Sequence, residues 1–89
     1  MKLPRDISAK ELTKSVQKLG YVITRQKGSH IRLTTSSNGE HHVTIPNHNS
    51  IKLGTLSSII GDIANHFKQT KEEIAEKLFG SIILINDQS

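Results

Sequence analysis

Cysteine is absent from this chain of 89 residues, and aromatic residues are scarce. The lack of cysteine excludes disulfide bonds, thiol catalysis and metal sites built on thiolates. The aromatic residues are one tyrosine and two phenylalanines, and both phenylalanines fall in apolar helical patterns. The stacking platforms of many single-strand RNA binders are therefore missing. Any nucleic acid would have to be recognised through its backbone charge and its shape.

Long hydrophobic segments are lacking too. The longest apolar run, Ile82–Ile85, is too short to cross a bilayer, and residues 1–6 contain no apolar core of a signal peptide. We therefore expect a cytoplasmic protein without membrane contact. A chain of this length predicts a single domain over residues 1–89, with a small core and its functional groups on the outside.

Positive charge is what the chain has in excess. Lysine and arginine number 12 against 8 aspartate and glutamate residues, which gives a net charge of +4 and an isoelectric point of about 9.6. This balance favours an anionic partner such as a nucleic acid or an acidic protein, although a merely soluble basic protein can carry the same charge. The gathering of Arg25, Lys27 and Arg32 around His30 favours the functional interpretation.

Helical periodicity predicts three helices. Ser8 followed by Glu11 is a capping-box pattern, and apolar residues recur at helical spacing until Gly20, which predicts a helix over residues 8–19. An amphipathic stripe follows Gly54-Thr55-Leu56 up to Phe67. A second capping box, Thr70 with Glu73, predicts a short third helix as far as Phe79.

Strand periodicity predicts three strands between the first two helices, over residues 21–27, 29–35 and 42–45. Asn38-Gly39 predicts the tight turn between the second and third strands. Alternation sends Ile31, Leu33, Val43 and Ile45 to the core, and it leaves His30, Arg32, His42 and Thr44 together on the other face. The expected class is α+β, in the order α-β-β-β-α-α.

Residues 80–89 extend beyond these elements. Residues 81–85 have the composition of a β-strand, bounded by Gly80 and by Asn86-Asp87. We expect a terminal strand that pairs with a sheet edge, mediates dimerisation or contacts a partner. A disordered tail is the alternative, against which four consecutive apolar residues argue.

The segment Gly28-Ser29-His30 carries the chemistry that the sequence suggests. Glycine at a hairpin permits a tight reversal and lets a phosphate approach the backbone, although a plain turn glycine would look the same. His30 is expected to point away from the core among cations, where an imidazole can accept the proton of a ribose 2′-hydroxyl. Arg25, Lys27 and Arg32 would then stabilise the charge on the attacked phosphate.

Two further side chains are candidates for RNA contacts. Ser29 is adjacent to a histidine, but neighbours on a strand point apart, so we interpret it as a hydrogen-bond donor to phosphate or to the turn. His48 follows Pro46 and could be brought near the same face as an acid for the leaving 5′-oxygen. It otherwise contacts substrate, orders its loop or is exposed without a role. His41 and His42 project to opposite sides of a strand and cannot bind one metal ion together, so no metal or cofactor is expected.

The motifs Gly28-Ser29-His30-Ile31-Arg32, Pro46-Asn47-His48 and Gly54-Thr55-Leu56 occur in an order that resembles the HicA toxin family, from about Leu3 to Leu78. The resemblance implies a small fold like that of double-stranded-RNA-binding domains. It also implies a toxin that cleaves mRNA without metal through one histidine, here His30. A HicB-type antitoxin would cover the active site, and operator DNA would be contacted only through that antitoxin.

A non-catalytic RNA-binding module of the same fold is the main alternative function. Such a binder could use the same basic face, but it has no need of an imidazole at His30. A subunit that only docks on another protein is disfavoured by the basic face. The intact Gly28-Ser29-His30 motif therefore favours a ribonuclease.

Overall fold

The computed structural model describes residues 3–87, with side chains for residues 3–80. The elements follow the chain order α1 (Ala9–Gln17), β1 (Val22–Lys27), β2 (His30–Thr35), β3 (His41–Pro46), α2 (Leu53–Phe67) and α3 (Lys71–Asp87). The predicted α+β class and the predicted order of elements are confirmed.

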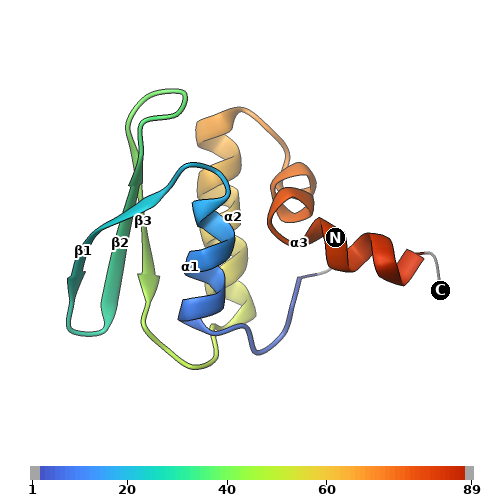
Figure 1. Ribbon diagram of the computed structural model, residues 1–89, viewed down its shortest axis with the longest axis horizontal. Coiled ribbons are helices and arrows are strands. Elements are labelled where there is room, and N and C mark those ends of the chain that lie inside the picture. Colours follow the sequence, from blue (N-terminus) through green and yellow to red (C-terminus); the bar gives the residue numbers. More distant parts are fainter. Residues whose placement is uncertain (1–2, 88–89) are drawn as a thin grey trace.

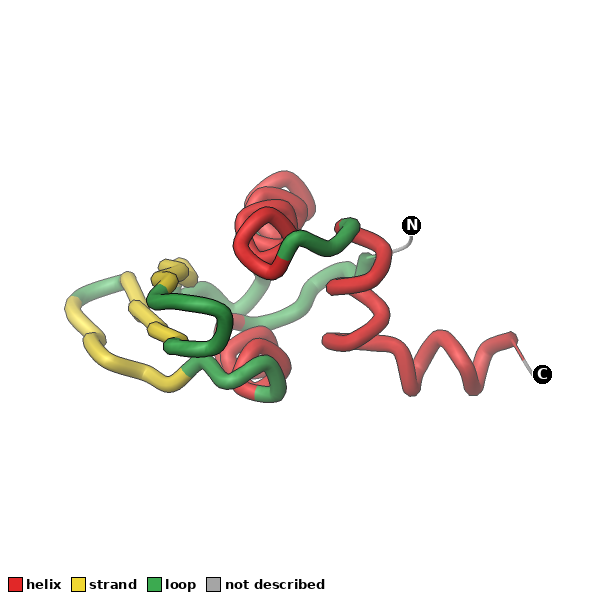
Figure 2. Tube along the Cα trace, turned by 90° about the horizontal axis from the view of Figure 1, so that it is seen from above, coloured by secondary structure: helices red, strands yellow, loops and turns green. Residues whose placement is uncertain are grey.

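The described elements form three layers (Figure 1). The strands make one antiparallel sheet in the order β1-β2-β3. Helices α1 and α2 contact β3 and cover one face of this sheet, while α3 packs against both helices from the side away from the sheet (Figure 2). No described element covers the other sheet face. Strand β1 lies farthest from the helices, and all six of its residues are exposed.

Capping boxes begin α1 and α3, as the sequence predicts. At α1, the Ser8 hydroxyl accepts a hydrogen bond from the Glu11 amide at 3.1 Å, and the Glu11 carboxylate accepts one from the Ser8 amide at 2.9 Å. Thr70 and Glu73 make the same reciprocal pair, at 2.8 and 3.0 Å. These bonds satisfy amides that a helix start otherwise leaves without partners, and so they fix where each helix begins.

The sheet buries one face and exposes the other. Ile31 and Leu33 of β2 and Val43 and Ile45 of β3 are buried beneath the helices. Their neighbours in sequence point to solvent, since side chains alternate along a strand. The predicted division between a core face and a polar face is confirmed, and His30 lies on the polar face.

The prediction of a terminal strand is wrong. Helix α3 continues to Asp87 and includes residues 81–85. A short apolar run does not distinguish a buried strand from a helix, and one glycine inside a helix costs only about 1 kcal/mol relative to alanine, so Gly80 does not have to end the helix. The contacts suggested for this extension depend on side chains outside the described residues.

Candidate nucleic-acid interface

A two-residue turn joins β1 to β2 and places His30 at the start of its strand. Lys27 pairs with His30 across the ladder, so only Gly28 and Ser29 form the turn. Gly28 has a φ of +57°, and a Cβ added there would meet no atom within 4 Å. Glycine is therefore required by the backbone conformation, as at the first central position of a type II′ turn, and the space beside it stays open for a ligand.

A β-bulge at Thr24 brings the cations to the same face as His30. Ile23 pairs with the buried Leu33, but the register then shifts by one residue, so that Arg25 pairs with Arg32. Without the extra residue, strict alternation from Ile23 would turn Arg25 and Lys27 toward the core side of the sheet. The bulge re-aims both side chains to the polar face.

These side chains surround an open depression of about 480 Å³ on the polar face. Its lining consists of Arg25, Lys27, Gly28, Ser29, His30, Arg32 and Thr44. Among residues with described side chains, the ion pairs are His41 with Asp62 and His42 with Glu40. Arg25, Lys27 and Arg32 therefore have no acidic partner among those residues. The depression therefore presents three cations to an external anion.

Arg25 and Arg32 face each other directly across the β1-β2 ladder. Like charges at directly opposite positions of an antiparallel pair are destabilising. Phosphate carries the complementary charge, and arginine is well suited to bind it because its planar fork can form two parallel hydrogen bonds. The pair thus costs stability in the free protein and is suited to an anionic ligand.

The structure brings together five of the six predicted site residues: Arg25, Lys27, Ser29, His30 and Arg32. His48 does not line the depression. It is exposed in the loop after β3, where its carbonyl oxygen accepts a hydrogen bond from the Ala9 amide at 2.9 Å. The adjacent Asn47 donates its amide proton to the Ser29 carbonyl oxygen at 2.7 Å. The loop is thereby tied to the β1-β2 turn, while the His48 backbone anchors α1.

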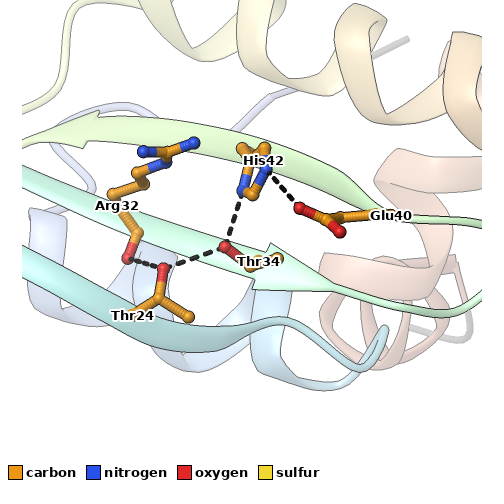
Figure 3. A network of polar contacts seen from close by, with 5 residues as sticks. All are labelled: Thr24, Arg32, Thr34, Glu40 and His42. Atoms are coloured by element: carbon orange, nitrogen blue, oxygen red, sulfur yellow. Dashed lines mark hydrogen bonds and ion pairs between the residues drawn. The ribbon is translucent and has the colours of Figure 1, made fainter.

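Sequence reasoning missed several polar residues of this face. Alternation places Thr44 on the polar face but does not mark it as part of the site that it lines. Thr24, Thr34 and Glu40 join His42 in one hydrogen-bonded chain across the sheet (Figure 3). Strand alternation groups Thr34 with His42 on this face, and counted from Ile23 it also places Thr24 there.

A second histidine cluster lies on the helix side of β3. The ring of His41 stacks on that of His66 with centroids 4.4 Å apart, and its Nδ1 lies 2.7 Å from the Tyr21 hydroxyl. Burial lowers the pKa of His41, and although the Asp62 carboxylate 3.7 Å from Nε2 acts in the opposite direction, burial is the larger effect. Burial also raises the pKa of Tyr21 to about 12, and Asp62 adds to this.

The His41 cluster predicts a loss of stability in mild acid. A histidine whose pKa is lowered in the folded state binds fewer protons than in the unfolded chain. Its contribution is therefore present above the unfolded value of 6.5 and is lost as the pH falls from there toward the lowered pKa. We expect the melting temperature to fall between pH 7 and pH 5.5, and less steeply in His41→Gln. The exposed His48→Gln serves as the control, and an unchanged slope in His41→Gln would contradict the assignment.

The described residues contain no group of three or more histidine, aspartate or glutamate side chains arranged to hold a metal ion. In the same part of the chain, no helix has the length and apolar character needed to cross a membrane.

The fold and the site define a class of small α+β domains with a cationic, histidine-bearing sheet face open to solvent. A scan against protein families matches the chain over residues 9–71 to the HicA toxin of bacterial toxin-antitoxin systems. The matched region runs from the first residue of α1 to the first residue of α3 and includes the whole depression. The chain belongs to the HicA family and is the toxin component of a toxin-antitoxin system. Searches of curated proteins and of solved structures found no significant match.

Proposed function

We propose that this toxin is a metal-independent endoribonuclease that cleaves mRNA, with His30 as the general base. The observation that carries the proposal is the depression itself, in which one exposed imidazole is surrounded by Arg25, Lys27 and Arg32. Cations without internal acidic partners favour a polyanion, and imidazole is the side chain whose ordinary pKa suits proton transfer near neutral pH.

The reaction follows from these groups. His30 accepts the proton of a ribose 2′-hydroxyl as that oxygen attacks the adjacent phosphorus, and the arginine and lysine side chains stabilise the added negative charge on the phosphate oxygens. The bond from phosphorus to the 5′-oxygen of the next nucleotide then breaks, and that oxygen takes a proton from water. The products are a 2′,3′-cyclic phosphate and a 5′-hydroxyl end, and His30 returns its proton to solvent.

Ser29 and His48 have accessory roles in this proposal. Ser29 lines the depression beside His30 and donates a hydrogen bond to a phosphate oxygen. His48 lies outside the depression in the loop tied to the β1-β2 turn, and it contacts the RNA strand on its way out of the site. Its loss should therefore weaken binding more than it slows the chemical step.

The partner in this proposal is a HicB-type antitoxin that covers His30. Occlusion suits a domain whose reactive group lies in an open depression, because a second protein can exclude RNA by covering the polar face. Carboxylates on the antitoxin would pair with the three cations and steer the encounter. Operator DNA would be bound by the antitoxin, and the toxin would reach it only through the complex.

Chelation and product analysis test the reaction. We expect cleavage of RNA to continue at an unchanged rate in excess EDTA, because every group that the mechanism needs belongs to the chain, to the substrate or to solvent water. The fragments should carry 2′,3′-cyclic phosphate and 5′-hydroxyl ends by mass spectrometry. Loss of activity in EDTA with recovery on adding a divalent ion, or fragments with 5′-phosphate ends, would refute the mechanism.

A further inference from the structure

A chain of hydrogen bonds crosses all three strands on the polar face, beside the depression (Figure 3). The Thr24 hydroxyl lies 2.8 Å from the Thr34 hydroxyl, which lies 2.7 Å from Nδ1 of His42. Nε2 of His42 lies 2.9 Å from a carboxylate oxygen of Glu40. The chain thus ends at a carboxylate, at the end of the sheet opposite the β1-β2 turn.

The partners of His42 fix the orientation of Glu40. A neutral imidazole has one donating and one accepting nitrogen, whereas an ionised carboxylate only accepts. Nε2 of His42 therefore donates to Glu40, and Nδ1 of the neutral ring accepts from the Thr34 hydroxyl. Since the second carboxylate oxygen has no partner in this chain of bonds and the Glu40 side chain is 73% exposed, the carboxylate is held in place and still able to accept hydrogen bonds.

Glu40 is unexpected on a surface that binds RNA. It is the only acidic residue between Gly20 and Asn47, a stretch that includes the entire sheet. Its charge repels phosphate, so backbone binding does not account for it. It also does not pair with the cations of the depression. His42, which holds Glu40, is opposite Thr34, and Thr34 is four residues along β2 from His30, or about 13 Å at the rise of a strand.

We propose that Glu40 contacts a guanine base of the RNA strand and is a specificity-determining residue of this toxin. The inference rests on the proposed ribonuclease function. Bases of single-stranded RNA are read on their Watson-Crick edges, and the three strands carry no phenylalanine, tyrosine or tryptophan that would bind any base by stacking. A carboxylate accepts hydrogen bonds only, and guanine alone offers two adjacent donors on that edge, N1–H and the N2 amino group.

The sheet fixes the position of Glu40 relative to His30, where the RNA strand would be cleaved. His30 and Glu40 lie toward opposite ends of the same sheet face, and Arg32 lies between them on β2. A strand whose phosphates follow the cations would place its cleaved bond at His30 and a base a few nucleotides away at Glu40. The substrate class is therefore single-stranded RNA with a guanine at one set distance from the cleaved bond.

The test separates base recognition from charge. Binding of the cleavage-deficient His30→Ala protein is measured with oligouridine RNAs that contain one guanine, inosine, adenine or cytosine. Inosine lacks the N2 amino group, so we expect guanine to bind roughly tenfold more tightly than any of the other three. Adding Glu40→Gln should remove this preference. Glu76→Gln makes the same charge change on α3 and should leave it intact.

Cleavage by the unmodified toxin gives a second readout. The cut in an oligouridine with one guanine should fall at one fixed spacing from that guanine, and in Glu40→Gln the cuts should spread along the strand. Thr34→Val removes the hydroxyl that positions His42, and it should reduce the guanine preference without changing affinity for oligouridine.

The outcomes distinguish this inference from the proposed function. Cleavage without guanine preference, or a preference that survives in Glu40→Gln, overturns the role of Glu40 while the ribonuclease stands. Guanine-selective binding without cleavage supports the role of Glu40 and refutes the ribonuclease. A Glu40→Gln effect on antitoxin affinity alone would assign the carboxylate to the protein interface and also overturn the proposal.

Discussion

Replacing His30 by alanine should lower the rate of RNA cleavage by roughly 10²–10⁴-fold, the usual contribution of a positioned general base. Arrest of growth on expression should be lost with it. The side chain is exposed on the polar face of β2, so its removal opens no cavity, and the free energy of unfolding should change by less than about 0.5 kcal/mol. Cleavage of a defined RNA and the melting temperature, measured on the same preparation, test both parts.

His48→Ala is the matched control for this experiment. It removes another exposed imidazole, from a loop next to the depression, and should reduce cleavage much less than His30→Ala does. A folded His30→Ala protein with full activity would end the assignment of His30. Equal losses in both variants would instead give His48 a direct part in proton transfer.

The elements that the sequence predicts best are those set by local chemistry. Each capping box pairs two side chains with two amides only three residues away, so Ser8 with Glu11 and Thr70 with Glu73 could be identified from spacing alone. The burial of Ile31 and Leu33 follows equally from alternation, because a shift of one residue would expose the whole apolar set.

The bulge at Thr24 is what the sequence does not reveal. Uninterrupted alternation in β1 groups Arg25 and Lys27 with Ile23, away from the polar face, yet the structure pairs Arg25 with Arg32. The predicted cluster of cations is thus present, but only because of the bulge, which simple periodicity does not predict. Whether an extra residue is inserted depends on the pairing of two strands, and neither strand contains that information by itself.

The polar network and His48 show the same limit. The bond between Thr24 and Thr34 joins two strands, and the orientation of Glu40 requires His42 to be held from a neighbouring strand. The Pro46-Asn47-His48 motif predicts an RNA contact for His48, but the position of His48 is set by the loop that joins β3 to α2. The positions of these side chains therefore depend on contacts between elements, which the sequence of one element does not contain.

Reversing the charge of Arg32 should make the protein more stable and less functional at the same time. In Arg32→Glu the carboxylate would face Arg25 across the ladder, which replaces a repulsive pair by an attractive one. Opposite charges at such positions contribute about 0.2–1 kcal/mol, so the melting temperature should rise. The same change removes one phosphate contact and adds a negative charge to the depression.

Affinity for RNA and affinity for the antitoxin should both fall by about tenfold or more in this variant, because both partners are proposed to pair with the same cations. The dependence of RNA binding on salt should weaken by about one unit of slope, as expected when one phosphate contact is lost. Association with the antitoxin should slow in both proteins as salt rises, and less so in Arg32→Glu.

Arg5→Glu is the matched control, since it makes the same charge reversal at an exposed position in the N-terminal segment outside the depression. It should change neither affinity by more than a small factor. Amide protection by the antitoxin should cover residues 29–45 if the inhibitor lies over the second and third strands. Weakened RNA binding with unchanged antitoxin binding, together with protection confined to α3, would show that the antitoxin acts from the helical side. Inhibition would then require a change transmitted through the core, because the depression itself would remain open.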